Sequence, residues 1–223
     1  KSLVKTGDMF GVDMCYRKIP EELNPYDYEA YDKNPTDFYA VVTNCHTGKA
    51  EYKKLDDMHK GIHYVRASSS LPLLSRTVWI KNKPYLDGGV SDSIPVRKSQ
   101  ELGNEKTVVV LTRDRSYRKG PNKAMPLIRL RYQKEFPKLV ERMKDRHIRY
   151  NETLDYLYQE EEKGNVFIIC PEKPVEIGRV EKDREKLEAL YQEGYRTAEK
   201  EYEKLQEFLG SPEMSEEGNS SPG

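Results

Sequence analysis

The chain has 223 residues, enough for one domain with a sizeable core, and its 38 Lys and Arg residues balance its 38 Asp and Glu residues. This neutral balance gives no indication of nucleic-acid binding. No apolar run approaches the roughly 18–20 residues that a membrane span needs. Charged residues reach 34% while the hydrophobic set is only 36%, so some segments should be solvated helices or tails.

The three cysteines, at positions 15, 45 and 170, show no motif spacing. A sparse, odd number of cysteines suits a reducing compartment better than a disulfide framework, so we expect a cytoplasmic protein. No apolar stretch of the signal-peptide kind follows the first residues. Because the chain also begins without Met, we expect the numbering to start inside a longer natural protein.

The N-terminal part of the sequence predicts loops followed by short strands. Residues 1–36 are rich in Tyr, Pro and Asp and should form loops with short helical turns. Residues 38–43 form a β-branched run that is typical of a buried strand, and residues 50–53 can return as its partner after a Thr-Gly turn.

Three further signals precede residue 104. The serines at 68–70 can cap a short helix that Pro72 either starts or bounds. Residues 77–86 predict a hairpin around a central Lys-Asn pair. A helix is expected over 94–102, where Gly103 ends it.

The C-terminal part alternates strands and helices. Residues 107–112 form an unbroken apolar run typical of a parallel strand, residues 166–170 form a second one, and residues 126–162 are mostly helical. This alternation predicts an α/β sandwich. Residues 180–209 form one long amphipathic helix. Its apolar stripe consists of Tyr191, Tyr195, Ala198, Tyr202, Leu205 and Leu209.

The most informative stretch is 85–89, Tyr-Leu-Asp-Gly-Gly, at the expected end of a strand. Glycine lets backbone pass close and take positive φ, so Asp87 on this turn can be presented to a ligand with little steric cover. Asp87 is therefore a candidate catalytic base, with Gly88 and Gly89 shaping its turn. The plain alternative is an ordinary Asp-Gly-Gly turn.

Two other groups approach catalytic or metal-binding patterns without completing them. The sequence around Ser91 nearly matches the Gly-x-Ser-x-Gly nucleophile elbow, but the last glycine is absent, so we expect Ser91 to cap the following helix. His59 and His63 have the spacing of a zinc pair on a helix, but a glycine between them weakens that helix. We therefore expect surface histidines, no metal site and no cofactor.

Charge is concentrated in the segment 113–149, which holds 13 Lys and Arg residues and four Asp and Glu residues. Two interpretations stay open: a solvated helical face, or peripheral contact with anionic lipid headgroups or another polyanion. Residues 181–209 carry nine acidic and six basic residues, which argues against the long helix as an anchor to anionic lipid. Its stripe should pack on the domain or on a second chain.

Four motifs in this order resemble the patatin-like phospholipase family, and most closely its small bacterial cytoplasmic branch. Residues 43–48, Thr-Asn-Cys-His-Thr-Gly, are similar to the family's Thr-(Asp/Asn)-x-x-Thr-Gly strand and turn. Residues 67–72, Ala-Ser-Ser-Ser-Leu-Pro, resemble its Ala-Ser-x-x-x-Pro helix, and residues 85–89 resemble its Asp-Gly-(Gly/Ala) box. Residues 94–96, Ile-Pro-Val, continue the pattern.

In that family a serine–aspartate dyad hydrolyses acyl esters and phospholipids: the serine attacks the carbonyl and the aspartate takes its proton, without a histidine. The resemblance makes Asp87 this base. It also implies a three-layer patatin-like sandwich with a mostly parallel central sheet. The family's Gly-rich oxyanion loop and its Gly-x-Ser-x-Gly elbow lie before the matched region, and neither occurs in these 223 residues.

We accordingly expect the C-terminal part of a patatin-like α/β domain over 1–179, with N-terminal strands missing, a long amphipathic helix over 180–210 and a disordered tail over 211–223. The parent function would be lipid acyl-ester hydrolysis, with the isolated chain inactive. The alternative is a catalytically inactive remnant or an interaction protein that docks through the long helix and the segment 113–149.

Overall fold

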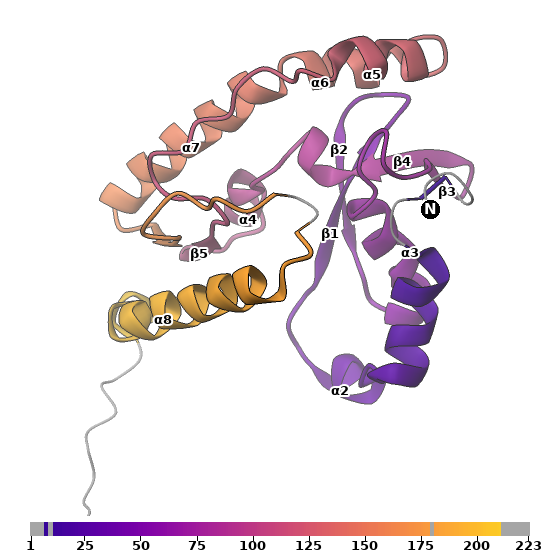
Figure 1. Cartoon of the computed structure of the whole chain (residues 1–223). Coiled ribbons are helices and arrows are strands. Elements are labelled where there is room, and N and C mark those ends of the chain that lie inside the picture. The colour runs from indigo at the N-terminus through magenta and orange to yellow at the C-terminus, as the bar shows by residue number, and fades with distance from the viewer. Residues whose placement is uncertain (1–6, 9–10, 179–180, 211–223) are drawn as a thin grey trace, which may run out of the picture. The chain divides into compact units, whose positions relative to one another are not determined.

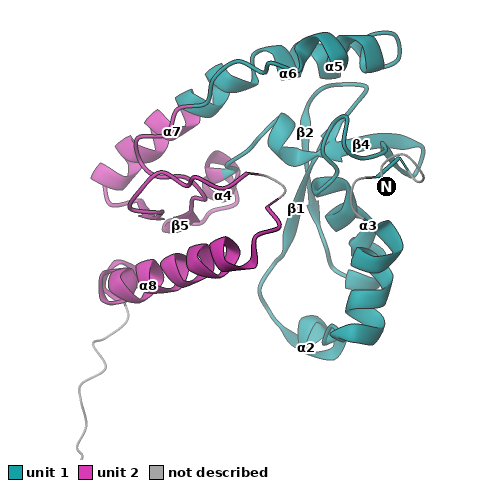
Figure 2. Ribbon diagram, viewed as in Figure 1, with its two compact units in different colours: residues 1–95, 119–152 teal, residues 96–118, 153–223 magenta. Residues whose placement is uncertain are grey.

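A computed structural model describes residues 7–8, 11–178 and 181–210. By contact, the chain divides into two compact units: residues 1–95 with 119–152 form unit 1, and residues 96–118 with 153–223 form unit 2 (Figure 2). The tail that was expected to be disordered lies outside the described residues, and the expected domain boundaries stay a prediction. No helix in the described ranges is both long and apolar enough to cross a membrane.

The first elements of unit 1 are helical. The π-helix η1 spans Met14–Leu23, and the short helix α2 spans Tyr28–Lys33 (Figure 1). The Asp27 side chain caps α2 by accepting a hydrogen bond from the Ala30 amide at 2.8 Å. The ten residues of η1 make it longer than the helical turns expected there.

A four-stranded sheet with the order β2-β1-β4-β3 forms the centre of unit 1. Its strands are β1 (Tyr39–Asn44), β2 (Ala50–Lys54), β3 (Val78–Ile80) and β4 (Lys83–Asp87). Both strand pairs expected from the sequence are present, but every neighbouring pair is antiparallel, so the expected mostly parallel central sheet is wrong. Tight turns join β1 to β2 and β3 to β4, and such turns can connect only antiparallel strands. The third pair, β1 with β4, is formed by strands far apart in the chain and is also antiparallel.

Helices cover both faces of this sheet. Tyr85 and Leu86 are neighbours on β4, so their side chains point to opposite faces. Tyr85 packs with Val42 and with Ala67 of α3, which spans Met58–Ser68. Leu86 packs against buried side chains of α5 (Met125–Tyr132) and α6 (Pro137–Lys144). The core on this second face also contains Cys45, Val90, Ile128, Phe136, Leu139 and Met143.

The serines at 68–70 end α3, so the short helix lies before Pro72, and these serines do not cap the start of a helix. The Ser69 hydroxyl donates to the Val65 carbonyl at 3.0 Å, and the Ser70 hydroxyl donates to the Arg66 carbonyl at 2.8 Å. The last carbonyls of a helix lack partners within the helix, and these two hydroxyls satisfy a pair of them in α3.

Unit 2 is built on one parallel strand pair. Strands β5 (Thr107–Val110) and β6 (Val166–Ile169) pair in parallel with Thr107 opposite Val166, which confirms the parallel character expected of both runs. The helix α4 (Val96–Glu101) precedes β5. The helix α7 (Arg146–Glu162) begins in unit 1 and ends in unit 2, where it leads into β6.

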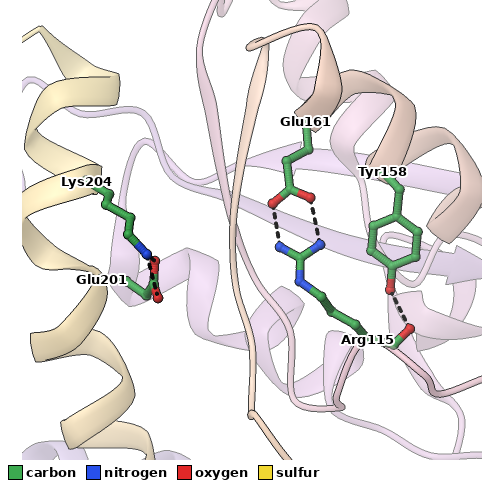
Figure 3. Close-up of polar contacts among 5 residues, drawn as sticks. All are labelled: Arg115, Tyr158, Glu161, Glu201 and Lys204. Carbon is green, nitrogen blue, oxygen red and sulfur yellow. Dashed lines mark hydrogen bonds and ion pairs between the residues drawn. The ribbon is translucent and has the colours of Figure 1, made fainter.

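Polar contacts fasten the loop after β5 to α7. The Arg115 guanidinium makes two parallel bonds to the Glu161 carboxylate, at 2.7 and 2.6 Å, and the Tyr158 hydroxyl donates to the Arg115 carbonyl at 3.1 Å (Figure 3). Such two-pronged pairs fix orientation as well as distance. The ion pair between Lys204 and Glu201 is local to the long C-terminal helix.

The long helix α8 (Arg184–Leu209) is present, but its packing differs from the expectation. None of its side chains is buried, and Tyr191, Tyr195 and Tyr202 of the expected stripe are exposed. The contact with β6 comes from another side of the helix, where the Phe208 ring lies 5.6 Å from the Phe167 ring. Packing of the stripe on the domain is therefore wrong for the described residues, and its packing on a second chain stays a prediction.

Candidate functional site

The Asp87 turn is held by hydrogen bonds from three directions. The Asp87 amide donates to the Ser70 carbonyl at 2.8 Å, and the Thr43 hydroxyl donates to the Asp87 carbonyl at 2.7 Å. The Gly89 amide donates to the Asp87 carboxylate at 2.7 Å. Both the main chain and the carboxylate of this half-buried residue therefore have fixed positions at the end of β4.

The two glycines after Asp87 are under different steric demands. A Cβ atom on Gly88 would lie 2.1 Å from the Val41 carbonyl oxygen, so backbone packs directly on this residue. A Cβ atom on Gly89 would lie 3.0 Å from the Asp87 carboxylate, which is a side chain and can shift. The short 3₁₀-helix η2 (Gly88–Val90) thus passes β1 at a distance that only glycine allows at its first position.

Two arginines from the segment 113–149, called the basic segment below, bind the carbonyls of this turn. The Arg146 Nε donates to the Gly89 carbonyl at 2.5 Å, and the Arg142 Nη2 donates to the Ser91 carbonyl at 2.8 Å. Burial, followed by the charge of Arg142, lowers the pKa of Arg149 in the same group. At these positions the basic segment is structural and partly buried.

Sequence reasoning missed both arginines as partners of the turn. Arg142 lies near the end of α6 and Arg146 is the first residue of α7, so no single helix periodicity links the two. The carbonyls that they bind lie more than 50 positions earlier, and no local pattern points to them.

An open pocket of about 380 Å³ lies beside the turn, entirely within unit 1. Asp87, Gly88 and Gly89 form part of its wall, together with Ser93 and with residues 38–41. All three residues expected in the catalytic turn therefore border one pocket. Its size is in the range of sites for small ligands.

Ser91 does not cap the following helix, so that expectation is wrong. Its side chain is buried, and its hydroxyl lies 2.7 Å from the Thr43 hydroxyl and 3.3 Å from the Gly88 carbonyl. The Ser93 hydroxyl donates to the Gly89 carbonyl at 2.6 Å. Through these bonds the two hydroxyls stabilise the turn.

The motif at residues 43–48 has a structural role beside this turn. The Asn44 side-chain oxygen accepts hydrogen bonds from the His46 and Thr47 amides, at 3.0 and 3.3 Å, which closes the turn after β1. Fixing this turn also fixes Thr43, whose buried hydroxyl bridges Asp87 and Ser91. The sequence marked Thr43 as part of a motif but did not identify it as the residue beneath Asp87.

The other candidate groups lie apart from this chemistry. His59 and His63 are exposed on α3, and the His59 ring stacks on Tyr28 at 3.8 Å. No group of three or more His, Cys, Asp or Glu side chains in the described ranges could hold a metal ion. Burial raises the pKa of the Cys45 thiol to about 12, so it stays protonated and is no nucleophile at neutral pH.

Comparison with known proteins places the turn inside a family match. Residues 2–98 match the family model described as Patatin-like phospholipase, and residues 136–210 match one described as Domain of unknown function (DUF6363). The chain is also similar to the Uncharacterized protein YjjU of Escherichia coli (strain K12), with 29% identity over 112 residues. That match covers 50% of this chain and 31% of the relative, so the chain matches only about a third of the relative's length.

Proposed function

We propose that this chain takes part in the hydrolysis of lipid acyl esters, with Asp87 as the catalytic base, because residues 2–98 match the patatin-like phospholipase family model. The observation that carries this proposal is the placement of Asp87. Its carboxylate is fixed by the Gly89 amide at the end of β4, borders an open pocket and lies within the matched residues. The substrate class is an acyl ester or a phospholipid.

In the proposed reaction Asp87 accepts the hydroxyl proton of a serine while the serine oxygen attacks the acyl carbonyl. A positioned general base of this kind contributes roughly 10²–10⁴-fold to the rate. A base must lie within hydrogen-bond distance of the proton that it accepts. The hydrogen bonds to Ser70, Thr43 and Gly89 fix the backbone and the carboxylate of Asp87 in place for this role. Gly88 and Gly89 shape the turn that presents it.

We place the nucleophilic serine outside these residues, because no Gly-x-Ser-x-Gly sequence occurs in them. The sheet offers a position for it. Strand β1 pairs with β2 from Tyr39 to Thr43, whereas β4 pairs with β1 only over 42–44 in the described part of the chain. The edge at 39–41 borders the pocket beside Asp87. A further strand there would extend the sheet toward the proposed three-layer sandwich and bring a serine to the carboxylate.

The cellular setting follows from the same proposal. Cys15, Cys45 and Cys170 are all free thiols, which supports a reducing compartment, and we propose the cytoplasm. The reaction needs no metal and no cofactor. The second candidate function is a non-catalytic interaction protein that docks through α8 and the segment 113–149, and the exposed stripe of α8 favours it.

The test is an esterase and phospholipase assay on the full natural chain that contains these residues. Asp87→Asn should lower kcat by about 10²–10⁴-fold, since it removes the base and keeps the size of the side chain. Asp56→Asn is the matched control, because Asp56 is exposed and forms only a loose ion pair with Lys54 at 3.6 Å. We expect the 223 residues alone to show no turnover.

Two outcomes would contradict the proposal. Full activity in Asp87→Asn would remove this residue from the mechanism. A full natural chain without any Gly-x-Ser-x-Gly sequence and without esterase activity would favour the interaction protein.

A further inference from the structure

The helix α5 has one face in the core and another, apolar one in solvent. Ile128 and Tyr132 are 1% and 2% exposed and belong to the core beneath the sheet. Leu127 and Leu130 are 59% and 85% exposed. Residues three apart are neighbours on a helix surface, so these two leucines form one apolar patch that points away from the core. Figure 1 shows α5 next to α6 in the chain.

Unpaired cations surround the two leucines. Lys123, Arg129, Arg131 and Lys134 are all exposed. None of the four forms an ion pair within the described ranges, and Arg131 contacts only the ring of its neighbour Tyr132, at 5.4 Å. The sequence from 123 to 134 contains no Asp or Glu.

Three cations elsewhere in the segment 113–149, Arg115, Arg118 and Lys138, have carboxylate partners. Arg118 pairs with Asp155 at 3.0 Å, and Lys138 pairs with Glu141 at 3.0 Å. The four cations of α5 and its flanks have no such partner in the described part of the chain, and all four are exposed.

We infer that this surface docks on an anionic lipid bilayer. The α5 docking face is defined as Lys123, Leu127, Arg129, Leu130, Arg131 and Lys134. The leucines enter the boundary between headgroups and acyl chains, and the four cations contact the phosphate and carboxylate groups of anionic lipids. This inference rests on the proposed function, because docking would bring the enzyme to its lipid substrate. Binding to a bilayer can nevertheless be measured without hydrolysis.

The chemistry of this face favours lipid over two other occupants. Single-stranded nucleic acid is held by cations together with aromatic rings on which bases stack, whereas the exposed apolar side chains here are leucines. A second copy in a two-fold contact would place the same patch against itself, and four cations would then face four cations. A bilayer with anionic headgroups satisfies both the leucines and the charges.

The test is co-sedimentation of the full natural chain with vesicles of ether-linked phospholipids, which contain no acyl ester to cleave. Vesicles with one third phosphatidylserine are compared with vesicles of phosphatidylcholine alone, at low and at physiological salt. We expect binding to the anionic vesicles that weakens as salt rises. Replacing Arg129 and Arg131 by Gln should weaken binding by roughly fivefold for each cation removed.

The leucines provide the second variant. Leu127→Ser with Leu130→Ser should weaken binding by at least about tenfold, because the two apolar side chains no longer enter the bilayer. The matched control is Lys186→Gln with Leu187→Ser on α8, where Leu187 is also exposed, and it should bind like the unmodified chain. Thermal unfolding of each variant checks that it is folded.

Three results would overturn the inference. The first is equal binding to neutral and anionic vesicles, or binding that survives both α5 variants. The second is tight binding to a short RNA that the leucine variant retains, which would assign the face to nucleic acid. The third is a dimer in sedimentation velocity that the leucine variant dissociates, which would assign it to a second copy. Loss of esterase activity in Asp87→Asn with unchanged vesicle binding would separate docking from catalysis.

Discussion

The two units end their strands in different ways. In unit 1, the end of β4 meets a turn in which amides, a hydroxyl and two guanidinium groups have fixed hydrogen-bond partners. In unit 2, the ends of β5 and β6 border a pocket of about 220 Å³ whose wall is mostly aliphatic. Its lining includes Val110, Ile169, Cys170, Leu190, Gly194 and Thr197.

A pocket at the end of a strand is a common position for a ligand site, and the ends of parallel strands are the more typical ones. Here the better candidate is at the antiparallel end, because there a carboxylate is held in place. Burial raises the pKa of the Cys170 thiol in the unit 2 pocket, which disfavours the thiolate form there. The unit 1 pocket is the better candidate site because its wall includes a carboxylate held by hydrogen bonds, and the direction of the strands does not decide between the two pockets.

The largest expected effect is that of Gly88→Ala. The new Cβ atom would lie 2.1 Å from the Val41 carbonyl oxygen and 2.5 Å from its carbon, so the backbone of η2 or β1 must move. We expect a loss of about 3 kcal/mol or more in the free energy of unfolding. Urea unfolding followed by circular dichroism measures it.

Gly89→Ala is the matched control for this change. Its Cβ atom meets the Asp87 and Arg146 side chains, at 3.0 and 3.3 Å, and side chains can shift. A loss below about 1 kcal/mol is expected. Equal losses in the two variants would show that the close approach to β1 is not what requires Gly88.

Glu51 in β2 should make the stability of unit 1 depend on acid. Burial of its carboxylate tends to raise its pKa, but hydrogen bonds from Lys53, Asn44 and Tyr85 outweigh this and lower the pKa to about 2. The folded pKa lies below the unfolded one, so the stabilisation is complete above about pH 5 and is lost as pH falls toward 2. The loss should reach up to about 3 kcal/mol.

Glu51→Gln should flatten this part of the stability profile, measured by urea unfolding at pH 2 to 7. Glu141→Gln is the control, because Glu141 is well exposed and pairs only with Lys138 on the same helix. A wild-type profile that is flat below pH 5, or one that Glu51→Gln leaves unchanged, would contradict the lowered pKa.

Arg146→Met should destabilise unit 1 by about 1.5–3 kcal/mol, because it removes a charged donor from the half-buried Gly89 carbonyl. Arg118→Met in unit 2 should cost less than about 1 kcal/mol, since its ion pair with Asp155 is exposed. Hydrogen exchange at the amides of 87–93 gives the local readout. Unchanged protection in Arg146→Met would mean that the turn holds itself without the arginine.

The sequence predicted the individual strands and their local pairs better than the direction of the central sheet. The β-branched run at 38–43 and the hairpin at 77–86 can be recognised from a few consecutive residues, and both are present. The mostly parallel central sheet was inferred from the resemblance and was wrong. A tight turn between two strands makes that pair antiparallel but does not determine how the other strands pair. The stripe of α8 shows the same limit, since apolar periodicity defines a face but does not identify what covers it.

The candidate site divides in the same way. Asp87 was found because a glycine pair next to an acid is a local signal. Thr43 and Arg146 reach the same turn from 44 and 57 positions away. Contacts at that distance depend on the packing of the whole unit, so no pattern along the chain contains them.

The smallest expected effect is a stabilisation, opposite in sign to that of Gly88→Ala, and concerns Gly194 in unit 2. Gly194 lies inside α8, and a Cβ atom there would meet nothing within 4 Å. Gly194→Ala should therefore stabilise the helix by about 0.5–1 kcal/mol, through the lower entropy cost of folding alanine. Gly164→Ala is the control: it has equal space, but its φ of +77° disfavours a side chain, so the change should destabilise by about 1 kcal/mol. If Gly194→Ala destabilises the protein while Gly164→Ala behaves as expected, the space beside Gly194 is filled in solution. The unit 2 pocket would then become a second candidate site beside the Asp87 turn.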